Sequence, residues 1–258
     1  MFGITRKIGT AVLRLLAPPL LLIAVWEALC RSGKFPDAVL VPPEQVYLTF
    51  VGLVQDGELW DNLEASGSRV LIGFAIGGGA GLVTGIALGL SRTLERYLGL
   101  SFTVLRQVPF IAWGPLLIIV MGIGEGFKIA IIANAAFFPM ALNTLDGVRN
   151  VPRNYRDVAA IFQFSRWSLI RRLIVPASLP FILTGLRLAL SRSWMMVVGA
   201  ELFASTIGIG HMMDWAREMF QIDVVMVGVL LTGIVGFLLD QSLRLIEARF
   251  STWKPRAA

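Results

Sequence analysis

The sequence has very few of the residues from which disulfides, metal sites and catalytic centres are commonly built. Its 258 residues include one cysteine, Cys30, and one histidine, His211. These numbers exclude a disulfide framework and a metal cluster of cysteines and histidines. Charged residues make up only 16% of the chain, whereas about 25% is usual in a soluble globular domain. The composition therefore does not favour a soluble protein.

Nucleotide-binding motifs are also absent. The stretch 122–128 comes nearest to the phosphate-binding pattern GxxxxGK[ST], but its spacing is wrong and no Ser or Thr follows Lys128. The glycines at 77–81 do not complete a GxGxxG pattern, because Leu82 occupies the last position. No Ser/His/Asp or paired-carboxylate arrangement is evident. We therefore expect a chain that is not an enzyme and that binds no cofactor of its own.

Apolar residues, by contrast, make up 56% of the chain and fall in blocks. Each block has about 20 residues, the length with which an α-helix crosses about 30 Å of hydrocarbon. This pattern predicts an all-α polytopic membrane protein with a single transmembrane domain over residues 1–258. The six predicted spans are 11–30, 67–91, 100–122, 127–147, 177–200 and 223–243. The first is expected to stay uncleaved, because no small-x-small site follows it.

The segments between the spans predict the orientation of the chain. We expect a surface helix near 44–56, polar turns at 91–99 and 122–126, and a loop of mixed polarity at 201–222. Most arginines and lysines lie at the two ends, in 91–99 and in 148–176. The positive-inside rule then places both termini and the arginine-rich loop in the cytoplasm. These arginines account for the net charge of +6, so the expected partner is the lipid bilayer and not nucleic acid.

The second span carries glycines at a strict spacing of four. They are Gly73, Gly77, Gly81, Gly85 and Gly89. On an α-helix this spacing places them along one stripe, where small residues let two helix backbones approach closely in lipid. We therefore expect a helix-packing surface here, which a transport cycle could also use as a sliding surface.

Several polar side chains fall inside the apolar blocks and are candidates for a solute pathway. Arg187 and Arg192 lie within the fifth span, Glu201 stands at its end, and Trp113 lies within the third. Charge in hydrocarbon is costly, so such groups usually face a protein interior or a water-filled path. The two arginines would suit an anionic solute. The alternative is a structural ion pair, for example between Arg192 and Glu201.

The long polar interval after the fourth span resembles the EAA motif of ATP-binding-cassette importer permeases. That pattern reads E-A-A, three residues, G, nine residues, then I-x-L-P. Asp157 stands for the glutamate, Val158 and Ala159 for the two alanines, Gln163 for the glycine, and 173–176 for the last four positions. The spacing is kept in full, while glutamine replaces the family's glycine. We expect one or two short helices here, the first beginning near Asp157 with an apolar side for a partner's groove.

Two further stretches, 106–129 and 179–202, are similar to permeases for nitrate, taurine and aliphatic sulfonates. The resemblance implies a type I importer permease fold with a cytoplasmic coupling loop at 148–176. It implies coupling residues Asp157, Ala159, Gln163 and Pro176, with Pro176 restarting the chain into the fifth span. It further implies a second permease chain, which we expect to be identical, cytoplasmic ATPase subunits that hold ATP and Mg, and a periplasmic or lipid-anchored binding protein. The expected location is the bacterial inner membrane.

The expected function is import of a small anion such as an aliphatic sulfonate or taurine. The same machinery could carry nitrate, bicarbonate or another small solute. Two other classes stay open at this point. One is a secondary transporter driven by an ion gradient, and the other is a membrane scaffold or intramembrane enzyme.

Overall fold

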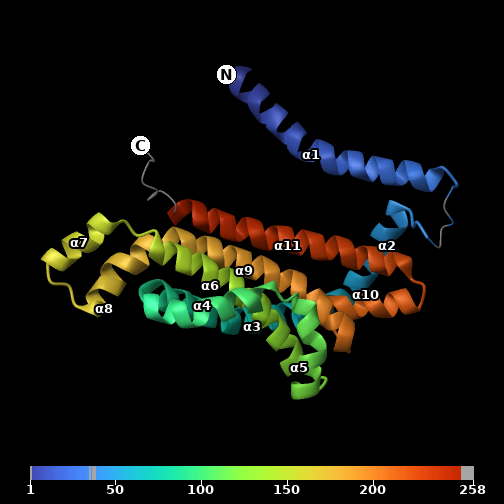
Figure 1. Ribbon diagram of the computed structural model, residues 1–258. Helices are drawn as coiled ribbons and strands as arrows, with labels where there is room; N and C mark the ends of the chain where they lie inside the picture. Colours follow the sequence, from blue (N-terminus) through green and yellow to red (C-terminus); the bar gives the residue numbers. More distant parts are fainter. Residues whose placement is uncertain (1, 35, 37–38, 251–258) are drawn as a thin grey trace. The chain divides into compact units, whose positions relative to one another are not determined.

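The computed structural model describes residues 2–34, 36 and 39–250, and every regular element among them is helical (Figure 1). The α-helices are α1 (Phe2–Arg31), α2 (Pro43–Gln55), α3 (Glu58–Leu90), α4 (Arg92–Gln107), α5 (Gly114–Met121), α6 (Glu125–Arg149), α7 (Arg153–Ile161), α8 (Arg166–Leu169), α9 (Val175–Ala204), α10 (Ile209–Glu218) and α11 (Ile222–Phe250). A 3₁₀-helix, η1 (Phe110–Trp113), and a π-helix, η2 (Ile170–Ile174), complete the set.

The chain divides into two compact units. The smaller unit comprises the chain up to Trp60 together with Met212–Leu231. Its core includes Val46 and Leu53 of α2, which pack with Met212 and Val227. The hydroxyl of Thr49 donates a 2.7 Å hydrogen bond to Asp223 within the same unit. The helix α2 coincides with the surface helix that the amphipathic pattern near 44–56 predicts.

The larger unit comprises Asp61–His211 and the chain from Thr232 onward. Four helical stretches in the described part of the chain are long and apolar enough to cross a membrane: Glu58–Leu90, Glu125–Arg149, Trp167–Phe203 and Ile222–Arg249. They overlap the second, fourth, fifth and sixth predicted spans. The first predicted span lies within α1, whose side chains up to residue 16 fall outside the described set.

The predicted third span, 100–122, is not one helix. α4 ends at Gln107, and Val108 is extended with φ −70° and ψ 120°. The cause is Pro109, because a proline ring disfavours the helical conformation of the residue before it. The short helices η1 and α5 then follow. The prediction that this region is helical is confirmed, but the prediction of a single continuous helix is wrong.

Two predicted loops are partly helical. The polar turn expected at 91–99 forms the first turns of α4, where the hydroxyl of Ser91 accepts a hydrogen bond of 3.2 Å from the backbone N–H of Leu94. Serine is a favoured N-cap because it satisfies such free amide groups. The loop expected at 201–222 contains α10. Both errors come from polar helices whose charge content is typical of loops.

Small residues bring α3, α6 and α9 into close contact. A methyl group added at Gly81 would lie 2.5 Å from the carbonyl oxygen of Phe137, and one added at Gly85 would lie 2.5 Å from that of Ala141. Gly77 lies against the backbone of Ala133, whereas the two end glycines of the stripe lie against the side chains of Ile132 and Val148. Such distances leave no room for a larger side chain. The middle of the stripe therefore lies against the backbone of α6 and its ends lie against α6 side chains.

Candidate functional site

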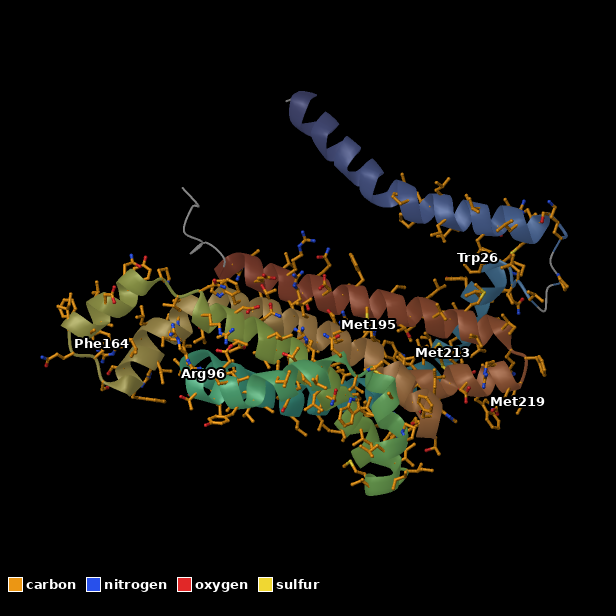
Figure 2. All side chains as sticks on the ribbon, in the orientation of Figure 1. Trp26, Arg96, Phe164, Met195, Met213 and Met219 are labelled. Carbon is orange, nitrogen blue, oxygen red and sulfur yellow. The ribbon has the colours of Figure 1, made fainter. Side chains whose placement is uncertain are left out.

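The loop after α6 forms a projecting helical segment. α7 begins at Arg153, directly after Pro152, and a connection that includes Phe164 leads to α8 (Figures 1 and 2). Asp157 is therefore in the second turn of α7 and not near its start. Pro152 sets the start, because proline is favoured just before the first helical residues. The expectation that this helix begins near Asp157 is therefore wrong, and the side chain of Asp157 is exposed.

Gln163 occupies a backbone conformation that glycine adopts most easily. Its φ is +52°, in the left-handed region. Its N–H donates to the carbonyl of Ala160 and the N–H of Phe164 donates to that of Ala159, both at 3.0 Å. These two bonds form the Schellman motif that ends many helices. The glycine at this place in the importer pattern thus has a physical reason, and Gln163 keeps the geometry despite the less favourable side chain.

The α7 segment exposes large apolar side chains. Ile161 and Phe162 are 78% and 71% exposed, and Val158 is also exposed. Ala159, between them in sequence, is only 5% exposed. A cluster of exposed apolar residues on a short helix marks a protein interaction site more often than a free surface. The arrangement suits an amphipathic helix that enters a partner's groove.

Pro176 does not restart the chain, which corrects the sequence-based expectation. The helix is continuous from Arg166 through η2 into α9, and Pro176 stands in the first turn of α9. A proline inside a helix clashes with the carbonyl four residues earlier, here that of Arg172. The wider turn of the π-helix η2 lies at this place and gives that carbonyl room. The last part of the loop, from Arg166 onward, and the long span therefore form one continuous helical stretch.

Glu201, another pathway candidate, is buried in an ion network. Its carboxylate is 1% exposed and lies 2.7 Å from the guanidinium of Arg69. The hydroxyl of Ser66 donates to both of its oxygens, at 2.8 and 2.9 Å, and the N–H of Gly210 donates at 2.9 Å. A buried carboxylate needs this many partners. Its charge partner is Arg69 and not Arg192, which the sequence suggested as one possibility.

The network extends to the start of α6. Arg69 also donates to Glu125 at 2.8 and 2.9 Å, and Glu125 lies 2.5 Å from Lys128. Asn62 accepts a 2.7 Å hydrogen bond from the N–H of Gly208. These contacts fix the segment between α9 and α10 against α3. Sequence reasoning did not single out Asn62, Ser66 and Arg69, although their spacing of four and three residues places them on one helix face.

Arg187 pairs with acidic residues of α11. Its guanidinium lies 3.2 Å from Glu247 and 3.7 Å from Asp240. The hydroxyl of Thr184, one turn earlier, donates to Glu247 at 2.6 Å. The two carboxylates of α11 therefore balance the charge of Arg187 in this conformation, and a role of Arg187 in solute passage stays a prediction. The acidic pair was identifiable because Asp240 and Glu247 are seven residues apart and share a face of α11.

Arg192 differs from Arg69 and Arg187, two other arginines within the long apolar helices that have carboxylate partners. Its side chain is exposed and makes no ion pair with any described residue. At 1.5 Å per residue it lies about 18 Å from the last residue of α9 and about 25 Å from the first. Met195, one turn further along, is exposed beside it (Figure 2). The indole N–H of Trp113, the other pathway candidate, is buried and has no hydrogen-bond acceptor among the described residues.

Comparisons with known proteins give consistent results. The family profile described as "Binding-protein-dependent transport system inner membrane component" matches residues 77–252. A putative aliphatic sulfonate transport permease of Bacillus subtilis is 39% identical over 92% of this chain and 86% of its own length. A taurine transport permease of Escherichia coli is 36% identical over 97% of this chain and 90% of its own. A nitrate import permease of Synechocystis is 31% identical over 88% and 85%.

Solved structures show the same fold. A chain of the MetNI methionine ABC transporter in an inward-facing conformation matches with a TM-score of 0.62 and 17% identity. The match covers 77% of this chain and 95% of that one. At this identity the similarity describes the fold alone, which is that of a type I importer permease.

Proposed function

Because this chain belongs to the family of inner membrane components of binding-protein-dependent transport systems, we propose that it imports a small anion, with aliphatic sulfonates and taurine as the first candidates. The chain is an integral membrane permease subunit of an ATP-binding-cassette importer. It works with ATPase subunits and a substrate-binding protein, and ATP hydrolysis belongs to the separate ATPase subunit, where ATP and Mg would bind.

The main support for an anionic solute is the position of Arg192. An unpaired guanidinium far from both ends of a membrane helix requires a polar environment, such as a water-filled path. There it attracts anions and repels cations. Relatives at 31–39% identity are named for sulfonates, taurine and nitrate, which are anionic or carry an anionic group. Three other cations in the larger unit's apolar helices have carboxylate partners: Arg69, Lys128 and Arg187.

The loop at 148–176 is proposed to receive the force of ATPase closure. The exposed apolar side of α7, with Ile161 and Phe162, would enter a groove of the ATPase, and Asp157 would meet basic groups at its edge. Gln163 and Ala159 hold the end of α7 in shape through the Schellman motif. Since the helix continues from α8 to α9 through Pro176, a displacement of the loop would pass to the span without a flexible joint.

The proposed assembly is a homodimer in the bacterial inner membrane, with six spans per chain and both termini in the cytoplasm. Apolar surface on α5 supports a second copy of the chain. Its residues Ile119 and Val120 are 83% and 75% exposed. A second permease chain would cover this surface and complete a pathway that includes Arg192.

The test is uptake by proteoliposomes that contain the permease, its ATPase and its binding protein. We expect ATP-dependent uptake of labelled taurine or ethanesulfonate, with nitrate tested in parallel. Replacing Arg192 with Gln should lower the maximal rate about tenfold, because a charged hydrogen bond contributes roughly 1.5–3 kcal/mol. The half-saturating concentration should change little, since the binding protein delivers the solute. Arg192→Lys should retain part of the rate.

Two outcomes would contradict this proposal in different ways. Uptake by the permease alone, driven by an ion gradient, would favour the secondary transporter. An unchanged rate for Arg192→Gln in an ATP-dependent system would leave the importer intact and remove Arg192 from the pathway.

A further inference from the structure

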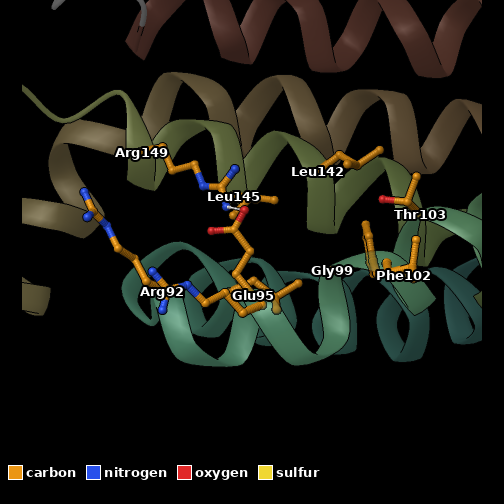
Figure 3. Close-up of a pocket in the computed structure, with 11 residues that line it drawn as sticks. Arg92, Glu95, Gly99, Phe102, Thr103, Leu142, Leu145 and Arg149 are labelled. Carbon is orange, nitrogen blue, oxygen red and sulfur yellow. Dashed lines mark ion pairs between the residues drawn. The ribbon is translucent and has the colours of Figure 1, made fainter.

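A pocket of about 620 Å³ lies where α3 ends, α4 begins and α6 ends (Figure 3). Its charged lining consists of Arg92, Glu95 and Arg96 from α4 and Arg149 from α6. Its apolar wall includes Phe102 and Leu142. A volume of this size suits a ligand that is larger than a small inorganic ion.

The polar end of the pocket has an excess of positive charge. Arg149 forms an ion pair with Glu95, and Figure 3 shows the two side chains pointing toward each other. Arg92 and Arg96 are exposed and make no ion pair with any residue that the structure describes. Guanidinium groups bind phosphate oxygens in a bidentate geometry, so two unpaired arginines on one helix turn favour a phosphate ligand.

The pocket lies at the level of the membrane surface. Two of the apolar helices end beside it, α3 at Leu90 and α6 at Arg149. Leu142 comes seven residues before Arg149, so it lies about 10 Å deeper along α6 at 1.5 Å per residue. Phe102, ten residues after Arg92, lies about 15 Å further along α4. Charge is therefore at the membrane surface and apolar surface lies toward the hydrocarbon.

We propose that this pocket binds an anionic phospholipid. The phosphate would contact Arg92 and Arg96, and an acyl chain would follow the apolar wall past Leu142 and Phe102. Basic pockets between membrane helices at the headgroup level recognise anionic lipids through these two contacts together. A free phosphate or sulfonate would satisfy the arginines alone and would leave the apolar wall uncovered. The Arg149–Glu95 pair holds the ends of α4 and α6 together at the rim.

The test is native mass spectrometry of the purified transporter complex titrated with dioleoyl phosphatidylglycerol or dioleoyl phosphatidylcholine. We expect preferential binding of phosphatidylglycerol to each permease chain. The double variant Arg92→Gln, Arg96→Gln should weaken it about 25-fold, since each arginine near a membrane surface contributes about fivefold. Arg244→Gln removes an exposed charge elsewhere in the chain and should leave the affinity unchanged. If the double variant does not fold, Arg96→Gln alone should weaken binding about fivefold.

Three results would overturn the proposal. The first is equal binding of the two lipids by the wild-type complex, or binding of neither. The second is undiminished phosphatidylglycerol affinity in the arginine variants. The third is displacement of the lipid by millimolar inorganic phosphate with the same dependence on Arg92 and Arg96, which would identify a site for free anions.

Discussion

Replacing Gln163 with Gly should make the end of α7 more stable, because Gln163 has a left-handed backbone with φ +52°. A residue with a Cβ in this conformation costs roughly 1–2 kcal/mol relative to the right-handed region. Glycine avoids this cost but loses more conformational freedom on folding, by about 0.5–1 kcal/mol. The Gln163 side chain is exposed, so its removal sacrifices little packing. The net expectation is a gain on the order of 0.5–1 kcal/mol.

The assay is amide hydrogen exchange of the purified transporter in detergent. The N–H groups of Gln163 and Phe164 donate the two bonds that close α7, so their exchange reports its opening. A gain of this size should slow exchange of the 160–165 peptide about two- to fivefold in Gln163→Gly. Gln163→Val should accelerate it, because a β-branched residue is strained at positive φ.

Ala160→Gly is the matched control, since it introduces the same residue three positions earlier at an ordinary helical conformation. Glycine there should destabilise α7 by about 1 kcal/mol and speed exchange. If Gln163→Gly and Ala160→Gly change exchange in the same direction, the backbone conformation of Gln163 does not control the stability of this loop.

Three further predictions address the packing, the ion network and the coupling loop. Gly81→Leu should lower the unfolding temperature and the yield, because its Cβ would lie 2.5 Å from the carbonyl oxygen of Phe137. Gly79→Leu is the control, since Gly79 faces open space and its replacement should not lower either quantity. Equal effects of the two variants would show that the stripe is not a contact surface between helices. Glu201→Ala should destabilise the chain by roughly 3–5 kcal/mol, because it leaves the buried Arg69 with one carboxylate partner fewer; an unchanged unfolding temperature in detergent would mean that the network is not structural. Asp157→Arg should reduce co-purification of the ATPase without lowering the unfolding temperature, since its side chain is exposed; full retention of the ATPase would exclude Asp157 from docking.

Local patterns were sufficient wherever the physical requirement is itself local. Long apolar helices appear in the sequence because hydrocarbon demands about 20 consecutive apolar residues. The glycine stripe was readable because the helical period turns a spacing of four into one face. The motif spacing around Asp157 and Gln163 identified the projecting loop, and the left-handed Gln163 supplies the reason for the family's glycine.

Other features could not be predicted, because a polar residue in such a chain can belong to a loop or to the polar face of a helix. The polar residues at 91–99 and 201–222 predicted loops, yet they belong in part to α4 and α10, where one helix face is polar. Glu201 and Arg187 read as pathway candidates, yet each has a charge partner more than 50 residues away in the sequence. A single side chain does not reveal whether its partner is a solute, water or a distant residue.

The sequence by itself determined the class of the protein, its long apolar helices and the motif spacing at 148–176, since each follows from residue type and spacing along one segment. Only the tertiary structure decided which charges are satisfied within the protein and which are not. That decision depends on segments brought together from distant parts of the chain, such as Ser66, Arg69, Glu125 and Glu201. Burial makes an unpartnered charge costly, so the folded chain pairs Arg187 and Arg69 and leaves Arg192 exposed.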